Sequence, residues 1–116
     1  MTITLYGIPN CDTVKKARKW LDERGIAYAF HDYKKQGADP AQVARWVAEA
    51  GWERVLNRRG TTFRSIPAAE TVNLDAASAV PLMVAHPSSI KRPIVEYPGG
   101  LLVGFDAEAW EAALAG

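Results

Sequence analysis

The chain has 116 residues, of which 48% are hydrophobic and 23% are charged. This length suits one domain, and the apolar content is sufficient for a packed core, so we expect a single domain over residues 1–116. Fourteen basic and thirteen acidic residues leave a formal net charge of +1. Such a balance gives no reason to expect direct binding of nucleic acid or of an anionic membrane.

The N-terminus and the cysteine count restrict location and cofactors. The first residues lack the basic and apolar regions of a secretory signal, and no run of about 18 apolar residues is present, so we expect a cytoplasmic protein. The chain has one cysteine, Cys11, and two histidines. This excludes an internal disulfide and argues against a structural zinc site, which usually takes several Cys or His ligands. We expect no bound cofactor and no metal.

The first third of the chain has the pattern of a strand, a helix and a second strand. Residues 2–6 are rich in β-formers and run into a turn that contains glycine and proline. From Cys11 onward, apolar residues recur at helical spacing as far as Gly25, which is placed to cap the helix. Residues 26–33 alternate as a strand does. This order predicts a parallel pair of strands with a right-handed crossover.

The middle of the chain is predicted to be a helical insertion over about residues 38–86. After a polar turn at residues 34–37, Asp39 as cap, Pro40 in the first helical position and Gln42 as the partner in a capping box predict a helix that ends at Gly51. Residues 52–66 suggest short helical pieces around a loop at 57–60. Because proline is tolerated in a first turn but costly deeper in a helix, Pro81 predicts that the next helix begins near Ala79.

The end of the chain has the pattern of a hairpin and a helix. Residues 93–96 and 101–105 are predicted strands, joined by a turn at residues 98–100. Asp106 is placed to cap a final helix with Trp110 on its inner face. The complete order is β-α-β, helical insertion, β-β-α, which is an α/β fold.

Cys11 follows a strand and a turn at the start of a helix, where a thiol can be activated. The first N–H groups of a helix have no partner within the helix, and the positive end of the dipole favours an anion. Lys15 and Lys16 add positive charge, and a position of this kind can lower a thiol pKa. The alternative is a residue that only packs, since free cysteine is among the most buried residue types.

Two basic segments are further candidates. Lys91-Arg92-Pro93 lies at the entrance of a late strand, where the planar guanidinium of Arg92 could bind an oxyanion, a carboxylate or a thiolate. Asn57-Arg58-Arg59-Gly60 forms the densest basic cluster. Ordinary solvated arginines are the alternative for both segments, and their spacing alone does not bring them together with Cys11.

These segments resemble the ArsC-type arsenate reductase family, in particular its small YffB-like members and, more distantly, the Spx regulators. Residues 5–17 are similar to the family's strand–loop–cysteine–helix signature, residues 56–60 to its middle arginine segment, and residues 86–94 to its late arginine–proline motif. The resemblance implies a thioredoxin-like fold with a mixed β-sheet. It also implies that Cys11 is the nucleophile, that Arg92 acts with it in catalysis, and that the peptide bond before Pro93 is cis. We expect the substrate- or anion-binding residues to be Arg58, Asn10, Lys15 and Pro93.

The chain departs from the family pattern at three positions. Arsenate reductases carry a histidine just ahead of the cysteine, where this chain has Gly7, and a third arginine after the hairpin turn, where it has Gly104. Spx regulators use a Cys-x-x-Cys pair, and here the second position is Val14. These departures argue against arsenate as the physiological substrate and exclude an internal disulfide switch.

The function expected from residues and resemblance together is that of a glutathione-dependent thiol reductase acting on a small molecule or a mixed disulfide. Because the chain has no second cysteine, reduced glutathione or a glutaredoxin has to resolve the intermediate. Two alternatives stay open. One is a non-catalytic, Spx-like adaptor with a protein partner, and the other is an arsenate reductase that uses an external thiol.

Overall fold

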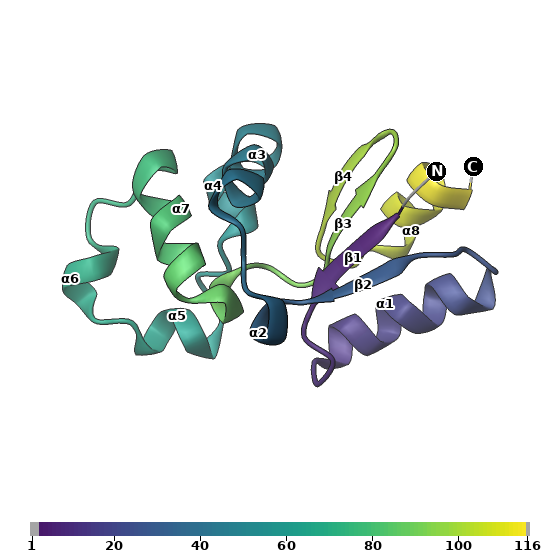
Figure 1. Cartoon of the computed structure of the whole chain (residues 1–116), viewed down its shortest axis with the longest axis horizontal. Coiled ribbons are helices and arrows are strands. Elements are labelled where there is room, and N and C mark those ends of the chain that lie inside the picture. The colour runs from purple at the N-terminus through teal and green to yellow at the C-terminus, as the bar shows by residue number, and fades with distance from the viewer. Residues whose placement is uncertain (1–2, 116) are drawn as a thin grey trace. The chain divides into compact units, whose positions relative to one another are not determined.

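The computed structural model of the chain describes residues 3–115 (Figure 1). They form two compact units. One consists of the residues up to Asp32 together with those from Arg92 onward and contains all four strands, and the other is helical and consists of Tyr33–Lys91. The insertion predicted for residues 38–86 falls inside the helical unit.

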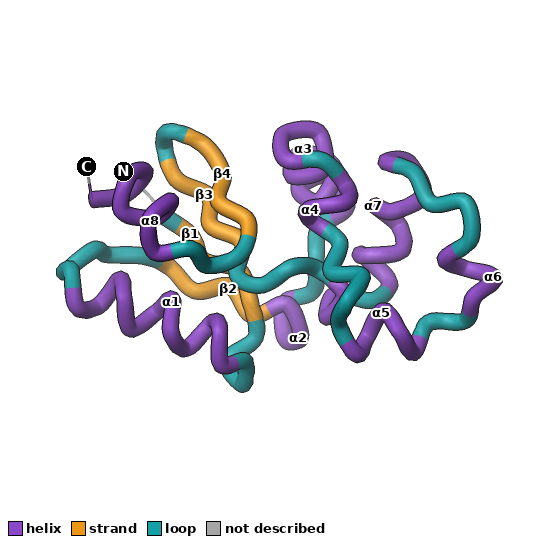
Figure 2. Tube along the Cα trace, turned by 180° about the vertical axis from the view of Figure 1, so that it is seen from behind, coloured by secondary structure: helices purple, strands orange, loops and turns teal. Residues whose placement is uncertain are grey.

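The four strands form one mixed sheet with the order β2-β1-β3-β4 (Figure 2). β1 (Thr4–Gly7) pairs in parallel with β2 (Ala29–Asp32) and antiparallel with β3 (Ile94–Tyr97), and β3 pairs antiparallel with β4 (Gly100–Val103). This confirms the parallel pair, the hairpin and the mixed sheet of a thioredoxin-like fold. Thr2, predicted to start the first strand, lies outside the described residues.

Helix α1 (Asp12–Glu23) buries one apolar face against the sheet. Gly25 follows it with a φ of 67°, in the left-handed region that glycine adopts without steric cost, and its N–H donates to the carbonyl of Asp22 over 3.1 Å. The predicted cap is therefore present. The core of this unit is formed by Leu5, Val14, Ala17, Trp20, Leu21, Val95 and Trp110.

Strand β2 is shorter than the predicted residues 26–33. The N–H of Ile26 closes the end of α1 by donating to the carbonyl of Leu21 over 3.0 Å, so it cannot take part in the ladder. The register with β1 starts at Ala29. After β2 the chain enters the short helix α2 (Tyr33–Gln36), where the sequence predicted a polar turn.

The helical unit follows the sequence pattern in its first part. Helix α3 (Pro40–Ala50) starts at Asp39, whose side chain accepts the backbone N–H of Gln42 over 3.1 Å, and Gly51 is its C-cap. Two short helices, α4 (Trp52–Val55) and α5 (Thr61–Ser65), lie on either side of the predicted loop. The short α6 (Ala68–Thr71) was not predicted.

The prediction that the next helix begins near Ala79 was wrong, because α7 spans Ala76–Ala85. Its first turn is closed by reciprocal bonds between Asp75 and Ser78: the Asp75 carboxylate accepts the Ser78 N–H over 2.7 Å, and the Ser78 hydroxyl accepts the Asp75 N–H over 3.0 Å. Pro81 therefore lies well inside the helix, where it removes a backbone hydrogen bond. The helix nevertheless starts before the proline, with its first turn closed by the capping box. The short helix η1 (Pro87–Ser89) follows.

The C-terminal segment completes the first unit with α8 (Ala107–Trp110) and the π-helical turn η2 (Glu111–Ala115). As predicted, Asp106 caps α8, accepting the Glu108 N–H over 3.0 Å. Trp110 is fully buried, and its indole N–H donates to the carbonyl of Gly104 over 3.0 Å. None of the helices in residues 3–115 has the length and apolar character that crossing a membrane requires.

Candidate active site

Sheet topology places the cysteine segment and the late arginine segment at the same edge of the first unit. Strand β1 runs out at Gly7 into the loop that carries Cys11. Strand β3 is antiparallel to β1, with Ile94 opposite Tyr6, so its first residue lies beside the last residues of β1. The segment that enters β3 carries Arg92. Cys11 and Arg92 therefore leave the sheet at one edge.

Cys11 is the N-cap residue of α1. Its backbone is extended (φ −109°, ψ 127°), its N–H donates to the carbonyl of Ile8 over 3.3 Å, and its carbonyl accepts the N–H of Lys15 over 2.9 Å. The side chain makes no capping hydrogen bond and is half-buried against the core of the unit, while Asn10 and Lys15 are exposed. The thiol thus lies at the positive end of a three-turn helix and is partly accessible.

Arg92 is half-buried, and among the described residues its guanidinium makes no hydrogen bond and no ion pair. The Arg92–Pro93 peptide bond is cis, as the resemblance implied. Pro93 is buried, and its carbonyl accepts the N–H of Gly104 over 2.8 Å. The arrangement leaves a cationic side chain available to an anion at the edge of the sheet where Cys11 lies.

Gly7 and Gly104 are held as glycines by two different constraints. A Cβ at Gly7 would lie 2.8 Å from Cγ2 of Val14, a fully buried residue of α1. Gly104 has a φ of 76°, in the left-handed region that strongly favours glycine. The family resemblance implies a histidine and an arginine at these two positions, and here the packing at Gly7 and the backbone at Gly104 disfavour a side chain.

Arg58 belongs to the helical unit, in the loop between α4 and α5. Its guanidinium carbon lies 5.3 Å from the centroid of the Trp52 ring, and its Nη2 lies 3.7 Å from Oε2 of Glu53. The backbone of the preceding Asn57 is hydrogen-bonded to the arginine–proline motif of residues 86–94, because its N–H donates to the carbonyl of Ser89 over 2.8 Å. The structure thus places Arg58 in one unit and the other five predicted site residues in the other.

Sequence reasoning predicted the loop at residues 57–60 but did not assign Asn57 and Ser89 a part in holding it. The side-chain oxygen of Asn57 accepts the N–H of Arg59 over 3.3 Å, and its carbonyl accepts the N–H of Gly60 over 3.4 Å. Asparagine at the first and glycine at the fourth position of a four-residue turn is a recognised sequence signal. Ser89, which is buried and accepts from Asn57, carried no comparable signal in the sequence.

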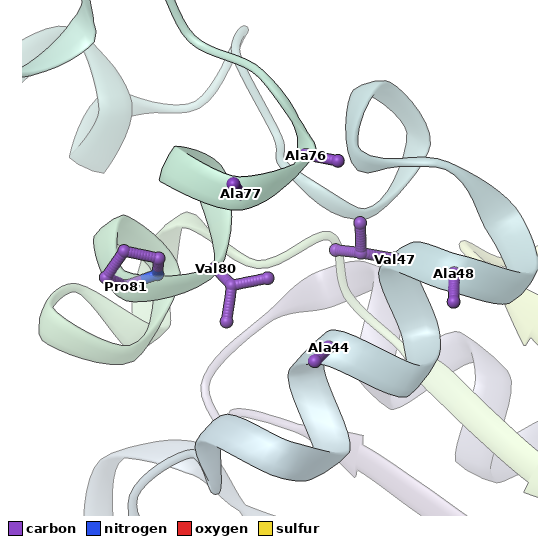
Figure 3. A pocket seen from close by; sticks show the side chains of 7 residues that line it. All are labelled: Ala44, Val47, Ala48, Ala76, Ala77, Val80 and Pro81. Atoms are coloured by element: carbon purple, nitrogen blue, oxygen red, sulfur yellow. The ribbon is translucent and has the colours of Figure 1, made fainter.

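The helical unit also has an apolar surface groove of about 480 Å³ between α3 and α7 (Figure 3). Its lining contains only small apolar side chains, so it offers no titratable or nucleophilic group. Within residues 3–115 there is also no group of three or more His, Cys, Asp or Glu residues placed to hold a metal ion. The lining residues of the groove are Ala44, Val47, Ala48, Ala76, Ala77, Val80 and Pro81.

Comparison with known proteins gives one family. The model of the ArsC family matches residues 6–113. A solved structure named YffB protein is 57% identical, covers 97% of this chain and 99% of its own, and has a TM-score of 0.95. An arsenate reductase (ArsC) related protein from Brucella melitensis is 54% identical, covers 97% and 93%, and has a TM-score of 0.76. The global transcriptional regulator Spx of Streptococcus agalactiae is 26% identical over 97% of this chain and 82% of its own length.

Proposed function

Since the chain belongs to the ArsC family, we propose that it is a thiol-dependent oxidoreductase in which Cys11 is the nucleophile and glutathione is the co-substrate. The observation that carries the proposal is the position of Cys11 as the N-cap of a 12-residue helix, with a half-buried side chain that makes no capping bond. A thiolate at this position faces N–H groups that have no partner within the helix. An unpaired thiol suits a reducing compartment, so we assign the activity to the cytoplasm.

The reaction consists of two thiol–disulfide exchanges. The Cys11 thiolate attacks the glutathione sulfur of a mixed disulfide, a new S–S bond forms between Cys11 and glutathione, and the substrate leaves as a thiolate. A second glutathione, or the thiolate of a glutaredoxin, then attacks the glutathione sulfur. This releases oxidised glutathione, or the glutathionylated glutaredoxin, and returns the Cys11 thiolate. The external thiol is oxidised and the substrate is reduced.

The basic residues have separate roles in this proposal. Arg92, which has no partner within the described chain, stabilises the negative charge of the substrate or of the leaving thiolate. The exposed Asn10 and Lys15 flank Cys11 and contribute to anion binding, with Pro93 fixing the segment next to Arg92. Arg58 binds an anionic group of the substrate, as the family resemblance implies.

The proposal is tested with the mixed disulfide of glutathione and 2-mercaptoethanol, with NADPH oxidation by glutathione reductase as the readout. Cys11→Ser should reduce turnover to the uncatalysed rate, because the hydroxyl cannot form the disulfide intermediate. Thr13→Ala, an exposed change in the same turn of α1, is the matched control and should keep its activity. Full turnover by Cys11→Ser would reject the proposal.

The second candidate function is a non-catalytic adaptor with a protein partner. Two observations favour it: the relatives named Spx, and the conformation of Gly104, which keeps the set of arginines incomplete. An adaptor of this kind should capture a partner equally well with Cys11→Ala, whereas a catalytic mixed disulfide with a protein substrate requires the thiol. Pull-downs with both forms of the protein separate the two functions.

A further inference from the structure

The loop that carries Arg58 has a fixed backbone. Asn57 makes three hydrogen bonds in this region. Its N–H donates to the carbonyl of Ser89, its side-chain oxygen accepts the N–H of Arg59, and its carbonyl accepts the N–H of Gly60. The turn is also closely packed, since a Cβ at Gly60 would lie 2.8 Å from Nδ2 of Asn57. The backbone on both sides of Arg58 is therefore hydrogen-bonded.

The guanidinium of Arg58, by contrast, is held by weak contacts on α4. The ion pair with Glu53 is long, at 3.7 Å, and the two side chains are 49% and 67% exposed. The contact with the Trp52 ring, at 5.3 Å, is also one that water can compete with. Exposed ion pairs of this kind contribute little to stability. A ligand that offers a carboxylate or another oxyanion can replace both contacts.

We infer that Trp52 and Glu53 hold the Arg58 guanidinium in a resting position from which an oxyanion displaces it, so that Glu53 lowers the affinity of the loop for anions. This inference rests on the proposed role of Arg58 in anion binding. The carboxylate of Glu53 competes directly with the carboxylate of an incoming ligand. Arg59 is exposed in the same loop and makes no ion pair with any carboxylate in residues 3–115, so it serves as an internal reference.

The experiment is a glutathione titration of the full chain carrying Cys11→Ser, which prevents disulfide formation with the probe. Two NMR signals report on the resting position: the Nε–H of Arg58 and the indole N–H of Trp52, the latter identified by its loss in Trp52→Phe. Both should shift together as glutathione binds. Glu53→Gln should bind glutathione about 1.5- to fivefold more tightly at low ionic strength, the factor that corresponds to an exposed ion pair.

An increase in affinity is informative because damage to the fold would lower it. Glu49→Gln is the matched control, since Glu49 is exposed on α3, pairs with no cation in the described chain and undergoes the same change in charge. Arg58→Ala should abolish the gain from Glu53→Gln, and Arg59→Ala should keep it. A parallel titration with sulfate distinguishes an inorganic oxyanion from a glutathione carboxylate. If Glu53→Gln gains affinity for sulfate alone, the site binds an inorganic oxyanion.

Two results would overturn the inference. One is an affinity of Glu53→Gln that does not exceed that of Glu49→Gln for either probe, and the other is the absence of a response at Trp52 when the protein is saturated. Turnover by the protein with Cys11 intact is a separate measurement. If turnover depends on Cys11 but Glu53→Gln gains no affinity for the anion, only the resting position is rejected. If Glu53→Gln gains affinity but turnover does not depend on Cys11, only the proposed reaction is rejected.

Discussion

The contact between Gly7 and Val14 gives a sharp test of how the sheet edge that bears Cys11 is built. In Gly7→Ala the new Cβ would lie 2.8 Å from Cγ2 of Val14, which is 0.6 Å below the 3.4 Å at which ordinary van der Waals contacts begin. Val14 is fully buried and β-branched, with essentially one rotamer available in a helix, so α1 has to move away from the strand. Overpacking of this kind costs about 1–3 kcal/mol.

The assay is urea unfolding followed by tryptophan fluorescence in a double-mutant cycle. Gly7→Ala should lower the free energy of unfolding by that amount in the wild type and by much less in Val14→Ala, where both Cγ atoms are absent. The matched control is Gly99→Ala, whose Cβ meets only the flexible, half-exposed Tyr97 ring at 2.9 Å. A neutral Gly7→Ala, or an equal loss in both backgrounds, would refute the reasoning.

Three further predictions concern the arginine site, the arginine loop and pH. Arg92→Ala should lower kcat/KM of the glutathione-coupled reaction by at least about tenfold, with Arg92→Lys intermediate because a lysine offers no planar fork; wild-type kcat/KM in Arg92→Ala would contradict this. Gly60→Ala should destabilise the wild type but not Asn57→Ala in urea unfolding, since its Cβ meets the Asn57 amide at 2.8 Å; additive losses would reject it. The pKa of Asp75 lies below its usual value, mainly because of a hydrogen bond from the Ser78 backbone and secondly because of one from the Ser78 side chain. A carboxyl whose pKa is lowered in the folded state stabilises the protein above its unfolded pKa, and this stabilisation disappears as the pH falls. The difference in unfolding free energy between wild type and Asp75→Ala should therefore shrink between about pH 5 and 3. A difference that grows on acidification would contradict this prediction.

Features that depend on neighbouring residues were predictable from the sequence. The N-cap of α1 at Cys11, the cap at Gly25 and the hairpin each follow from residue types a few positions apart. The start of α7 was mispredicted because two local signals conflict, the penalty of Pro81 and the capping box of Asp75 with Ser78. The sequence contains both, but their relative strength depends on hydrogen-bond geometry.

The site was predictable only in part, because its constraints act between segments. The edge shared by Cys11 and Arg92 follows from an antiparallel pairing of residues nearly ninety positions apart, which no spacing rule reports. The tie between Asn57 and Ser89 is of the same kind. Glu53 is close to Arg58 in sequence, yet only side-chain geometry shows that the two carry an ion pair. The sequence and the family resemblance supplied the candidate residues, and the structure added the contacts of Arg58 with Trp52 and Glu53.

The two glycine departures bear directly on the choice of substrate. Close approach to Val14 favours glycine at position 7, and a left-handed φ favours glycine at position 104. Because these constraints are independent, restoring the pattern of arsenate reductases would require a change in core packing at one position and in backbone conformation at the other. The sheet edge that bears Cys11 therefore lacks both of the side chains that the family resemblance places at these two positions. Under the proposed function, an edge without these two side chains favours a glutathione mixed disulfide, whose reacting sulfur is neutral, over a multiply charged oxyanion.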